Sequence, residues 1–233
     1  MNDKCNDCKS KLCASKVTIF SNLSQHDLIE IISMTGHEGY KKGETIFFEG
    51  KEANTLYLIN KGKIKLFKYT KDGREQILDI LSEGDFFGEL NLFKEGQYSF
   101  NAKAVTPTKL CTLTKENMRE IILKRPEIAI KILEVVGDRL SKLETLAQNL
   151  ATNDAEVRIA NLILELKERY GKNAPDGIEI KLPITREDMS YYAGVARETI
   201  SRKLKKFEEE GIIKLIGIKK IIILDEEKLE NYI

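Results

Sequence analysis

The stretch TREDMSYYAGVARETISRKLKKFEEE, residues 185–210, decides how the C-terminal part of this 233-residue chain folds. Apolar residues recur at helical spacing on both sides of a small-residue turn, Ala-Gly-Val. Thr185 is followed three residues later by Asp188, a capping-box pattern that predicts the start of the first helix. The apolar face of the second helix consists of Ile200, Leu204 and Phe207. Two short helices joined by a tight glycine turn predict a helix-turn-helix.

The second helix of this motif carries a local excess of positive charge, although the net charge of the whole chain is only +1. A focused basic patch is what a helix needs to enter a groove of DNA, because the rest of the surface need not be basic. The alternative is an ordinary solvated helix face. The following stretch, IIKLIGIKKIIIL at 212–224, predicts a hairpin that turns near Gly217 and forms a wing. The basic residues of the helix are Arg197, Arg202, Lys203, Lys205 and Lys206. Glu198 is the one acidic residue in the same stretch, residues 197–206.

Short β-rich runs separated by glycines occupy residues 36–113. These runs are ETIFF, TLYLI, KIKLFKY, QILDIL and KAV, and the KDGR sequence at 71–74 is a strong hairpin signal. Strands at such regular spacing predict a small sandwich or barrel. Because helices are predicted on both sides of this region, the fold class is α+β.

A long helix is predicted from Pro126, a favourable first-turn residue, to about residue 151. Its apolar residues alternate at spacings of three and four, which is the narrow seam of a coiled coil. We interpret the seam as a dimerisation surface, because the nearest identical helix is that of a second subunit. The alternative is a helix packed on its own domain. The seam consists of Leu133, Val136, Leu140, Leu143, Ala147 and Leu150.

Three of the four cysteines, Cys5, Cys8 and Cys13, lie in a short polar N-terminal segment, and the fourth is Cys111. In an intracellular chain such clustering favours metal or redox chemistry over structural disulfides. Four thiolates are the ligand count of an iron–sulfur cluster or of a structural zinc site. A redox-active dithiol, or four reduced cysteines that bind no metal, would also be compatible with this pattern.

Composition and charge argue against several classes of protein. No apolar run approaches the roughly 20 residues needed to span a bilayer, and the N-terminus lacks the apolar region of a secretion signal. We therefore expect a cytoplasmic protein without a membrane partner. With two histidines, no glycine-rich dinucleotide loop and no Ser/His/Asp or Cys/His set, the sequence does not predict an enzyme.

From about residue 20 to the end, the chain resembles the CRP/FNR family of bacterial transcription regulators. The motifs that carry the resemblance are GDFFGEL at 84–90 and RETISR at 197–202. The resemblance implies a cyclic-nucleotide-binding-type β-roll, a long dimerisation helix and a C-terminal winged helix-turn-helix. It also implies a homodimer that binds a DNA palindrome, and that contacts RNA polymerase if it is an activator. The expected parts are a cysteine-rich segment (1–16), the sensor roll (17–125), the dimerisation helix (126–152) and the DNA-binding domain (153–233).

The second helix of the motif is the expected reader of bases. By resemblance, Glu198, Ser201 and Arg202 match the residues with which the FNR branch reads a TTGAT half-site, and Arg197 matches an additional reader of CRP-like members. An arginine suits guanine and a glutamate accepts from cytosine. We therefore expect a palindrome containing TTGA or TGTGA. Expected phosphate contacts, which position without specifying sequence, are Thr185, Thr199, Lys203 and Lys214.

The residues of the roll indicate which signal is sensed. In the cyclic-AMP members an Arg-Ser pair holds the phosphate, whereas Tyr98 precedes Ser99 here. A phosphodiester needs a charge-assisted partner that tyrosine does not supply, so cyclic AMP is not the expected signal. Glu89 is interpreted as a structural residue that bonds to backbone groups.

The cysteines of the chain resemble those of the FNR branch. In that branch three N-terminal cysteines and one at the end of the roll hold a 4Fe-4S cluster, and Cys111 matches the distant ligand. The spacing C-x2-C-x4-C is one residue shorter than usual for that branch. The resemblance thus implies sensing of oxygen, nitric oxide or redox state. The alternative is a small organic ligand or a haem-bound gas in the roll, with cysteines that bind zinc or act as redox thiols.

Overall fold

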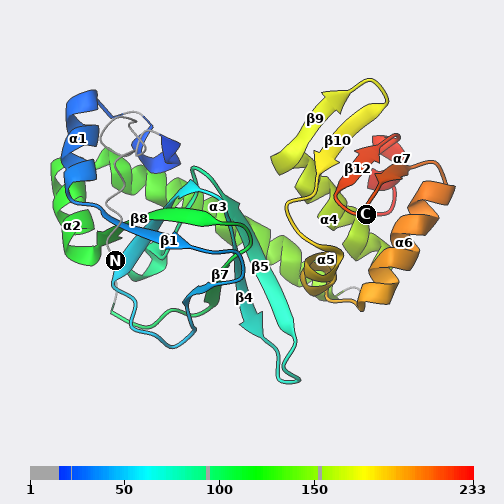
Figure 1. Ribbon diagram of the computed structural model, residues 1–233, viewed down its shortest axis with the longest axis horizontal. Helices are drawn as coiled ribbons and strands as arrows, with labels where there is room; N and C mark the ends of the chain where they lie inside the picture. Colours follow the sequence, from blue (N-terminus) through cyan, green and yellow to red (C-terminus); the bar gives the residue numbers. More distant parts are fainter. Residues whose placement is uncertain (1–15, 22, 93–94, 152–153) are drawn as a thin grey trace. The chain divides into compact units, whose positions relative to one another are not determined.

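The computed structural model describes residues 16–233 apart from 22, 93–94 and 152–153, so Cys5, Cys8 and Cys13 lie outside the described residues. The described residues form two compact units, whose elements are labelled in Figure 1. The first unit contains 16–68 and 78–140, and the second contains 69–77 and 141–233. Among the residues described, no helix is long and apolar enough to cross a membrane.

The β-rich part of the chain folds into two four-stranded sheets, which confirms the prediction of a small β-roll. The first sheet has the order β1 (Gly36–Tyr40), β8 (Thr108–Thr114), β3 (Thr55–Lys61) and β6 (Phe86–Phe87). The second has the order β2 (Thr45–Phe47), β7 (Asn101–Ala104), β4 (Lys63–Tyr69) and β5 (Glu75–Ser82). Gly88 follows β6 with a φ of +90°, and a Cβ there would lie 2.5 Å from the Thr55 carbonyl oxygen. Only glycine fits this turn without strain.

Strands β3, β6 and β8 of the first sheet are buried on both faces, and each face supplies a different core, whereas β1 at the edge is exposed. Successive side chains of a strand point to opposite faces, so Leu110 and Cys111 of β8 enter different cores. The aromatic core consists of Ile46, Phe47, Ala53, Tyr57, Ile59, Ile64, Leu66, Leu81, Phe87, Tyr98, Ala102 and Leu110. The Cys111 core consists of Val17, Ile19, Phe20, Leu28, Ile31, Leu56, Leu58, Phe86, Leu92, Cys111, Leu113, Met118, Ile121, Ile128 and Ile132.

Helices cover the sheet face that bears Cys111. Ser24 caps α1 (Gln25–Ser33) by accepting from the Asp27 amide, and Thr114 caps α2 (Lys115–Lys124) in the same way. Pro126 ends α2 and precedes α3 (Glu127–Ala151), close to the limits predicted for the long helix. The short 3-10 helix η2 (Thr18–Phe20) contributes Ile19 and Phe20 to this core, and η3 (Glu89–Asn91) directly precedes Leu92, another of its residues.

The second unit contains α4 (Ala155–Tyr170), α5 (Arg186–Ala193), α6 (Arg197–Glu209) and α7 (Glu226–Glu230). Its sheet has the order β11 (Ile213–Ile216), β12 (Lys220–Ile223), β10 (Gly177–Lys181) and β9 (Gly171–Ala174). The predicted wing is the β11–β12 hairpin, with Gly217 in its turn at a φ of +59°. Residues 171–174 form β9 and pair with β10. A Cβ at Gly171 would lie 2.4 Å from the Lys167 carbonyl oxygen, and one at Gly177 would lie 2.0 Å from the Ile223 carbonyl oxygen, so both positions require glycine.

Candidate nucleic-acid interface and sensor residues

The helix-turn-helix forms as the sequence predicts. The Thr185 hydroxyl accepts from the Asp188 amide, and the Asp188 carboxylate accepts from the Thr185 amide, each at 3.1 Å. This reciprocal capping box fixes the start of α5. Gly194 ends α5 in the left-handed region with a φ of +62°, which turns the chain into α6. Ala196 offers no side-chain cap, so the first amides of α6 are available to an anion.

Helix α6 has an apolar face and a polar face. Ile200, Leu204 and Phe207 are at most 1% exposed and attach the helix to the unit. The four expected base readers are exposed on the remaining surface, and they are Arg197, Glu198, Ser201 and Arg202. The helix is therefore bound along one side and leaves its predicted reading residues accessible.

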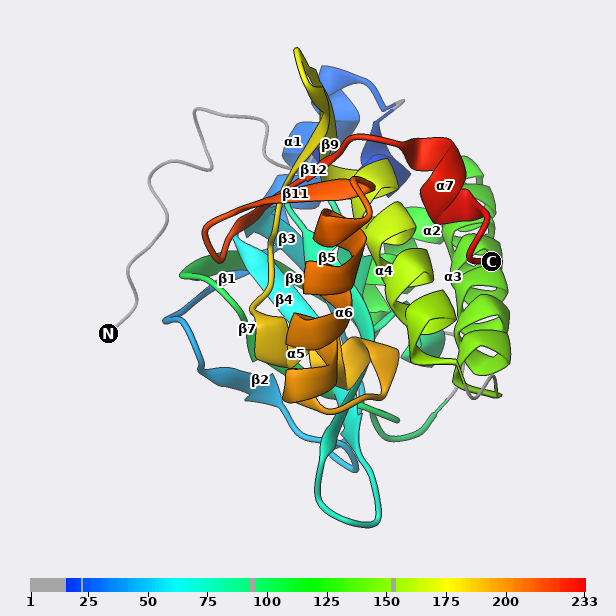
Figure 2. The same ribbon diagram turned by 90° about the vertical axis from the view of Figure 1, so that its right-hand side faces the viewer.

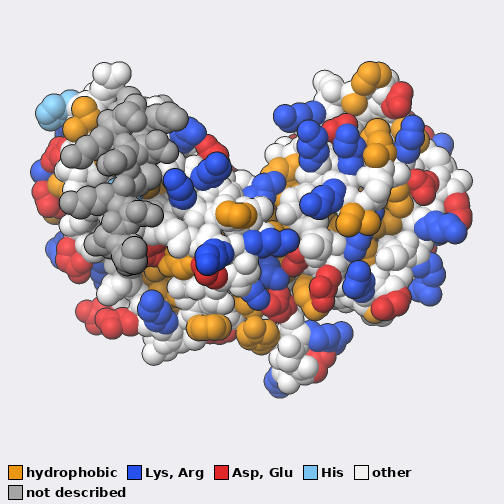
Figure 3. All heavy atoms as spheres, viewed as in Figure 1, with side chains coloured by type: hydrophobic (Ala, Val, Ile, Leu, Met, Phe, Trp, Pro, Cys, Tyr) orange, Lys and Arg blue, Asp and Glu red, His pale blue; other side chains and the backbone are white. Residues whose placement is uncertain are grey.

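The expected phosphate contacts differ in their surroundings. Thr185 is exposed but its hydroxyl also caps α5, and Thr199 is half-buried. Lys214 is exposed on β11, with its ammonium 3.7 Å from the Asp176 carboxylate. Lys203 is half-buried, and its ammonium is paired with the Glu156 carboxylate, which is 13% exposed. Figure 3 shows Lys and Arg side chains (blue) interspersed with acidic ones (red) over the visible face of this unit.

Sequence reasoning did not single out Arg186, the first residue of α5. Its guanidinium is partly buried, and its Nη1 has no hydrogen-bond partner among the residues described. Burial lowers the pKa of Arg186. A cation at a helix N-terminus is unfavourable unless an anion approaches, because both present positive charge. Arg186 is thus a partly buried cation at the start of α5, and its sequence signal is its place directly after the cap.

The predicted seam of α3 is largely solvent-exposed. Leu133, Leu140 and Leu143 are 65%, 58% and 46% exposed, while Val136 is half-buried against the Cys111 core. Ala147 is exposed, and the side chain of Leu150 is outside the described part of the chain. On the opposite side, Ile128 and Ile132 are buried in the Cys111 core. A line of exposed leucines is an apolar surface of the kind that a second helix can cover.

Tyr98 occupies the interior of the roll at the position expected for the phosphate-binding arginine. Its side chain is 2% exposed, and its ring stacks on Phe47 with centroids 3.7 Å apart. Its hydroxyl donates to the Thr55 carbonyl at 3.0 Å, and burial raises its pKa. Ser99, in contrast, is exposed. The region is thus packed with rings and presents no guanidinium at position 98.

Glu89 pairs with a side chain of the long helix, whereas the sequence analysis expected backbone partners. Its Oε1 accepts from Arg139 Nη1 at 2.5 Å, and Arg139 Nη2 donates to the Phe86 carbonyl. The Arg139 guanidinium also lies 5.1 Å from the centroid of the Phe86 ring. Glu89 Oε2 is buried without a hydrogen-bond partner among the described residues. The pair therefore ties α3 to the roll at a buried carboxylate.

Cys111 is the one expected metal ligand that the structure describes. Its side chain is 4% exposed and packs in the same core as Val17, Ile19 and Phe20. These residues directly follow the N-terminal cysteine segment in sequence. The structure thus brings the start of the described chain to the sheet face that carries the Cys111 thiol.

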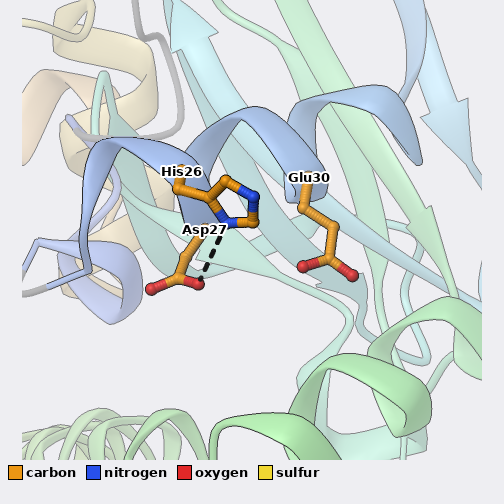
Figure 4. A group of neighbouring side chains, drawn as sticks. All are labelled: His26, Asp27 and Glu30. Atoms are coloured by element: carbon orange, nitrogen blue, oxygen red, sulfur yellow. Dashed lines mark ion pairs between the residues drawn. The ribbon is translucent and has the colours of Figure 1, made fainter.

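A second group of possible metal ligands lies on α1, where His26, Asp27 and Glu30 are neighbours (Figure 4). Asp27 is already paired with Arg125, and Glu30 with Lys124 at 2.6 Å. The hydrogen bond from Arg125 lowers the pKa of Asp27 to about 2. Because both carboxylates are neutralised by cations at the C-terminal end of α2, we interpret the group as a link between helices rather than a metal site.

Comparisons with known proteins match both parts of this architecture. A cyclic nucleotide-binding domain model matches residues 37–125, and a Crp-like helix-turn-helix domain model matches residues 157–232. The cAMP-activated global transcriptional regulator CRP of Pasteurella multocida is 36% identical over 180 residues, which cover 76% of this chain and 85% of that protein. A CRP-like cAMP-activated regulator of Mycobacterium tuberculosis is 29% identical, covering 92% of this chain and 96% of the relative.

Solved structures agree with the fold. FixK2 from Bradyrhizobium japonicum has a TM-score of 0.75 at 25% identity, covering 85% of this chain and 96% of FixK2. A CooA mutant from Carboxydothermus hydrogenoformans has a TM-score of 0.79 at 21% identity, covering 92% and 93% of the two chains, and so shares the fold. The chain belongs to the CRP/FNR family of transcription regulators. These are DNA-binding proteins that typically act as homodimers, and they are not enzymes.

Proposed function

We propose that this regulator binds a TTGA- or TGTGA-type palindrome as a homodimer and senses oxygen, nitric oxide or redox state. The sensor would be a 4Fe-4S cluster held by Cys5, Cys8, Cys13 and Cys111. The observation that carries the proposal is the position of Cys111, in one core with the residues that follow the N-terminal cysteines.

The reach of the chain supports this ligand set. Cys13 is four residues before Val17, and an extended chain spans at most about 3.6 Å per residue, or about 14 Å in all. Val17 packs in the Cys111 core. Cys13 is therefore joined to a residue of the Cys111 core by a link of at most about 14 Å. Four thiolates suit iron–sulfur chemistry, and such a cluster would supply redox activity and reactivity towards oxygen and nitric oxide.

The contents of the aromatic core favour this signal over cyclic AMP, although two relatives are cAMP-activated by name. Tyr98 replaces the expected arginine and stacks on Phe47. Glu89, a residue of the Gly-Glu-Leu motif, is paired with Arg139. A cyclic nucleotide would have to displace packed rings without gaining a charge-assisted phosphate contact.

The Cys111 core also connects the proposed sensor to the dimerisation helix. Ile128 and Ile132 of α3 lie within this core, and Val136 packs against it. Leu133 and Leu140 are exposed on the same helix. A change in packing around Cys111 would therefore shift a helix whose outer side bears the proposed dimer contacts.

Anaerobic purification tests the sensor. We expect a brown protein with about four iron and four sulfide per chain, and loss of both in Cys13→Ala and in Cys111→Ser. Leu113→Val is the matched control, because it changes a neighbouring side chain of the same strand and core without removing a thiol. A colourless zinc protein, or iron that persists in both cysteine variants, would contradict the proposal. So would a cyclic-AMP-dependent rise in melting temperature of the iron-free protein.

Binding to a TTGA-type palindrome tests the reader. Arg202→Ala should lose about 1–3 kcal/mol of specific binding, which is roughly 5- to 150-fold in affinity. Lys205→Ala removes one exposed charge from the same helix and should weaken all sequences alike. Unchanged affinity of Arg202→Ala for the palindrome would show that α6 does not read these bases.

A further inference from the structure

Helix α6 is joined to α4 by a triad of charges. Glu156 lies in the first turn of α4, and its two carboxylate oxygens bind different lysines of α6. Oε1 is paired with Lys203 Nζ, and Oε2 lies 2.7 Å from Lys206 Nζ. Figure 2 shows α4 beside α6 within the second unit. The Glu156 side chain is only 13% exposed, whereas those of Lys203 and Lys206 are 24% and 41% exposed.

Local structure holds the triad in place. Asp154 caps α4 by accepting from the Glu156 amide at 2.7 Å, which fixes the backbone that carries this carboxylate. Lys203 and Lys206 are three residues apart, so they share one flank of α6. Hydrogen bonds from Lys203 and Lys206 lower the pKa of Glu156, and the bond to Glu156 raises the pKa of Lys206. Both shifts favour the charged forms of Glu156 and Lys206.

This arrangement divides the basic residues of α6 into two groups. Lys203 and Lys206 each bind the half-buried Glu156 carboxylate of another helix. The other three, Arg197, Arg202 and Lys205, are exposed. Lys205 lies 3.7 Å from Glu209 of its own helix, as Lys206 does from Glu210, but both side chains of the Lys205 pair are at least 66% exposed. The positive charge available to DNA is thus smaller than the sequence of α6 suggests.

We propose that Glu156 is a specificity-determining residue, whose carboxylate keeps Lys203 and Lys206 away from DNA phosphates. Binding that is independent of sequence depends on the number of phosphates that lysines and arginines neutralise. Binding to the correct palindrome depends in addition on contacts with bases. By holding two flexible ammonium groups, Glu156 weakens binding that is independent of sequence. It leaves the base-reading residues of α6 free to contact bases. The inference rests on the proposed role of α6 as the reader.

The salt dependence of binding measures the effect. For Glu156→Gln, log K for a duplex lacking the palindrome should fall more steeply with log salt, by about 0.9 per added phosphate contact and so by about 1–2 in slope. Affinity for that duplex should rise roughly three- to tenfold at moderate salt, and the ratio of specific to non-specific affinity should fall. Glu156→Gln combined with Lys203→Gln should bring the slope back towards that of the parent protein.

Glu168→Gln is the matched control. It makes the same charge change on the same helix, and Glu168 is 71% exposed and paired with Lys167 instead of a residue of α6. Equal slopes for Glu156→Gln and Glu168→Gln would overturn the proposal. A parallel loss of specific and non-specific affinity with an unchanged slope would also overturn it, since Glu156 would then act only as a structural clamp.

The single variants Lys203→Gln and Lys206→Gln keep the test decisive if Glu156→Gln does not fold. The proposal expects their non-specific slopes to equal that of the parent, because neither lysine contacts phosphate. A shallower slope in either variant would overturn it. Arg202→Ala in the same assay separates the two proposals. If this variant binds the palindrome as tightly as the parent, the proposal that α6 reads bases fails, whereas the proposal about Glu156 is judged by the salt slopes.

Discussion

The two cores on either face of the first sheet of the roll differ in what they contain and in what they touch. The aromatic core is closed by its own rings, with Tyr57 and Phe87 stacked at 4.9 Å and Phe47 and Tyr98 at 3.7 Å. The Cys111 core instead gathers residues from the start of the described chain, α1, α2 and α3. One face is thus self-contained, and the other connects distant parts of the chain.

Two neighbouring residues of β8 belong to two different candidate sensor sites, one in the aromatic core and one in the Cys111 core. Leu110 points into the aromatic core and Cys111 into the other, because side chains alternate along β8. The family resemblance alone suggests the aromatic side, where a cyclic nucleotide domain would hold its ligand. The positions of Tyr98 and Cys111 favour the opposite face.

The largest effect that distinguishes the two cores is on iron content. Cys111→Ala should abolish iron and sulfide binding in anaerobically prepared protein, because a 4Fe-4S cluster would lose one of its four thiolates. Tyr98→Phe keeps an aromatic ring in the other core and should retain the full iron content. Iron and sulfide analysis of the two variants checks the comparison. If Cys111→Ala and Tyr98→Phe contained equal amounts of iron, the Cys111 core would not hold the sensor.

The second effect is on stability and concerns the aromatic core. Tyr98→Ala should lower the free energy of unfolding by about 3–5 kcal/mol, because it leaves a cavity among stacked rings. Tyr98→Phe should cost only about 1 kcal/mol, since it removes the hydrogen bond to the Thr55 carbonyl. Denaturant unfolding of the metal-free protein measures both values. A small cost for Tyr98→Ala would mean that the roll interior is open enough for a ligand.

Local patterns predicted much of this molecule, and contacts between distant residues account for what they missed. The capping box of Thr185 and Asp188 and the glycine turn are local, so the helix-turn-helix could be predicted from sequence. The cap of α4 is also local, because Asp154 accepts from the Glu156 amide two residues later. The Glu156 triad joins residues 47 and 50 positions apart, and the Arg139–Glu89 pair joins residues 50 apart. No spacing rule connects such positions, because their meeting depends on packing of whole helices.

The third effect is on dimerisation through the exposed side of α3, the helix whose other side packs in the Cys111 core. Leu140→Glu should weaken dimerisation about 10- to 100-fold, which corresponds to about 1.4–2.8 kcal/mol of lost apolar burial. Sedimentation equilibrium over a range of concentrations measures it. Leu123→Glu on α2 is the control, since Leu123 is 75% exposed and outside the seam. If the two variants dimerise equally well, the seam of α3 is not the dimer contact.

The smallest effect concerns the link between α1 and the end of α2 at the edge of the Cys111 core. The hydrogen bond from Arg125 lowers the pKa of Asp27 from its ordinary 3.8 to about 2. A carboxyl whose pKa is lowered by folding stabilises the fold above its ordinary pKa, and this stabilisation is lost as pH falls through the folded value. Asp27→Asn should therefore be less stable than the parent at pH 7, and the difference should shrink between about pH 4 and pH 2.

Urea midpoints at about pH 7, 4 and 2.5 test this expectation, with Asp138→Asn on the exposed side of α3 as a control for the change in charge. The midpoint of the control should follow that of the parent at every pH. If the deficit of Asp27→Asn stayed constant down to the lowest pH, its loss would come from the cap of α1. Asp27 would then support that helix through Ser24 alone, and the ion pair with Arg125 would not be what joins α1 to α2.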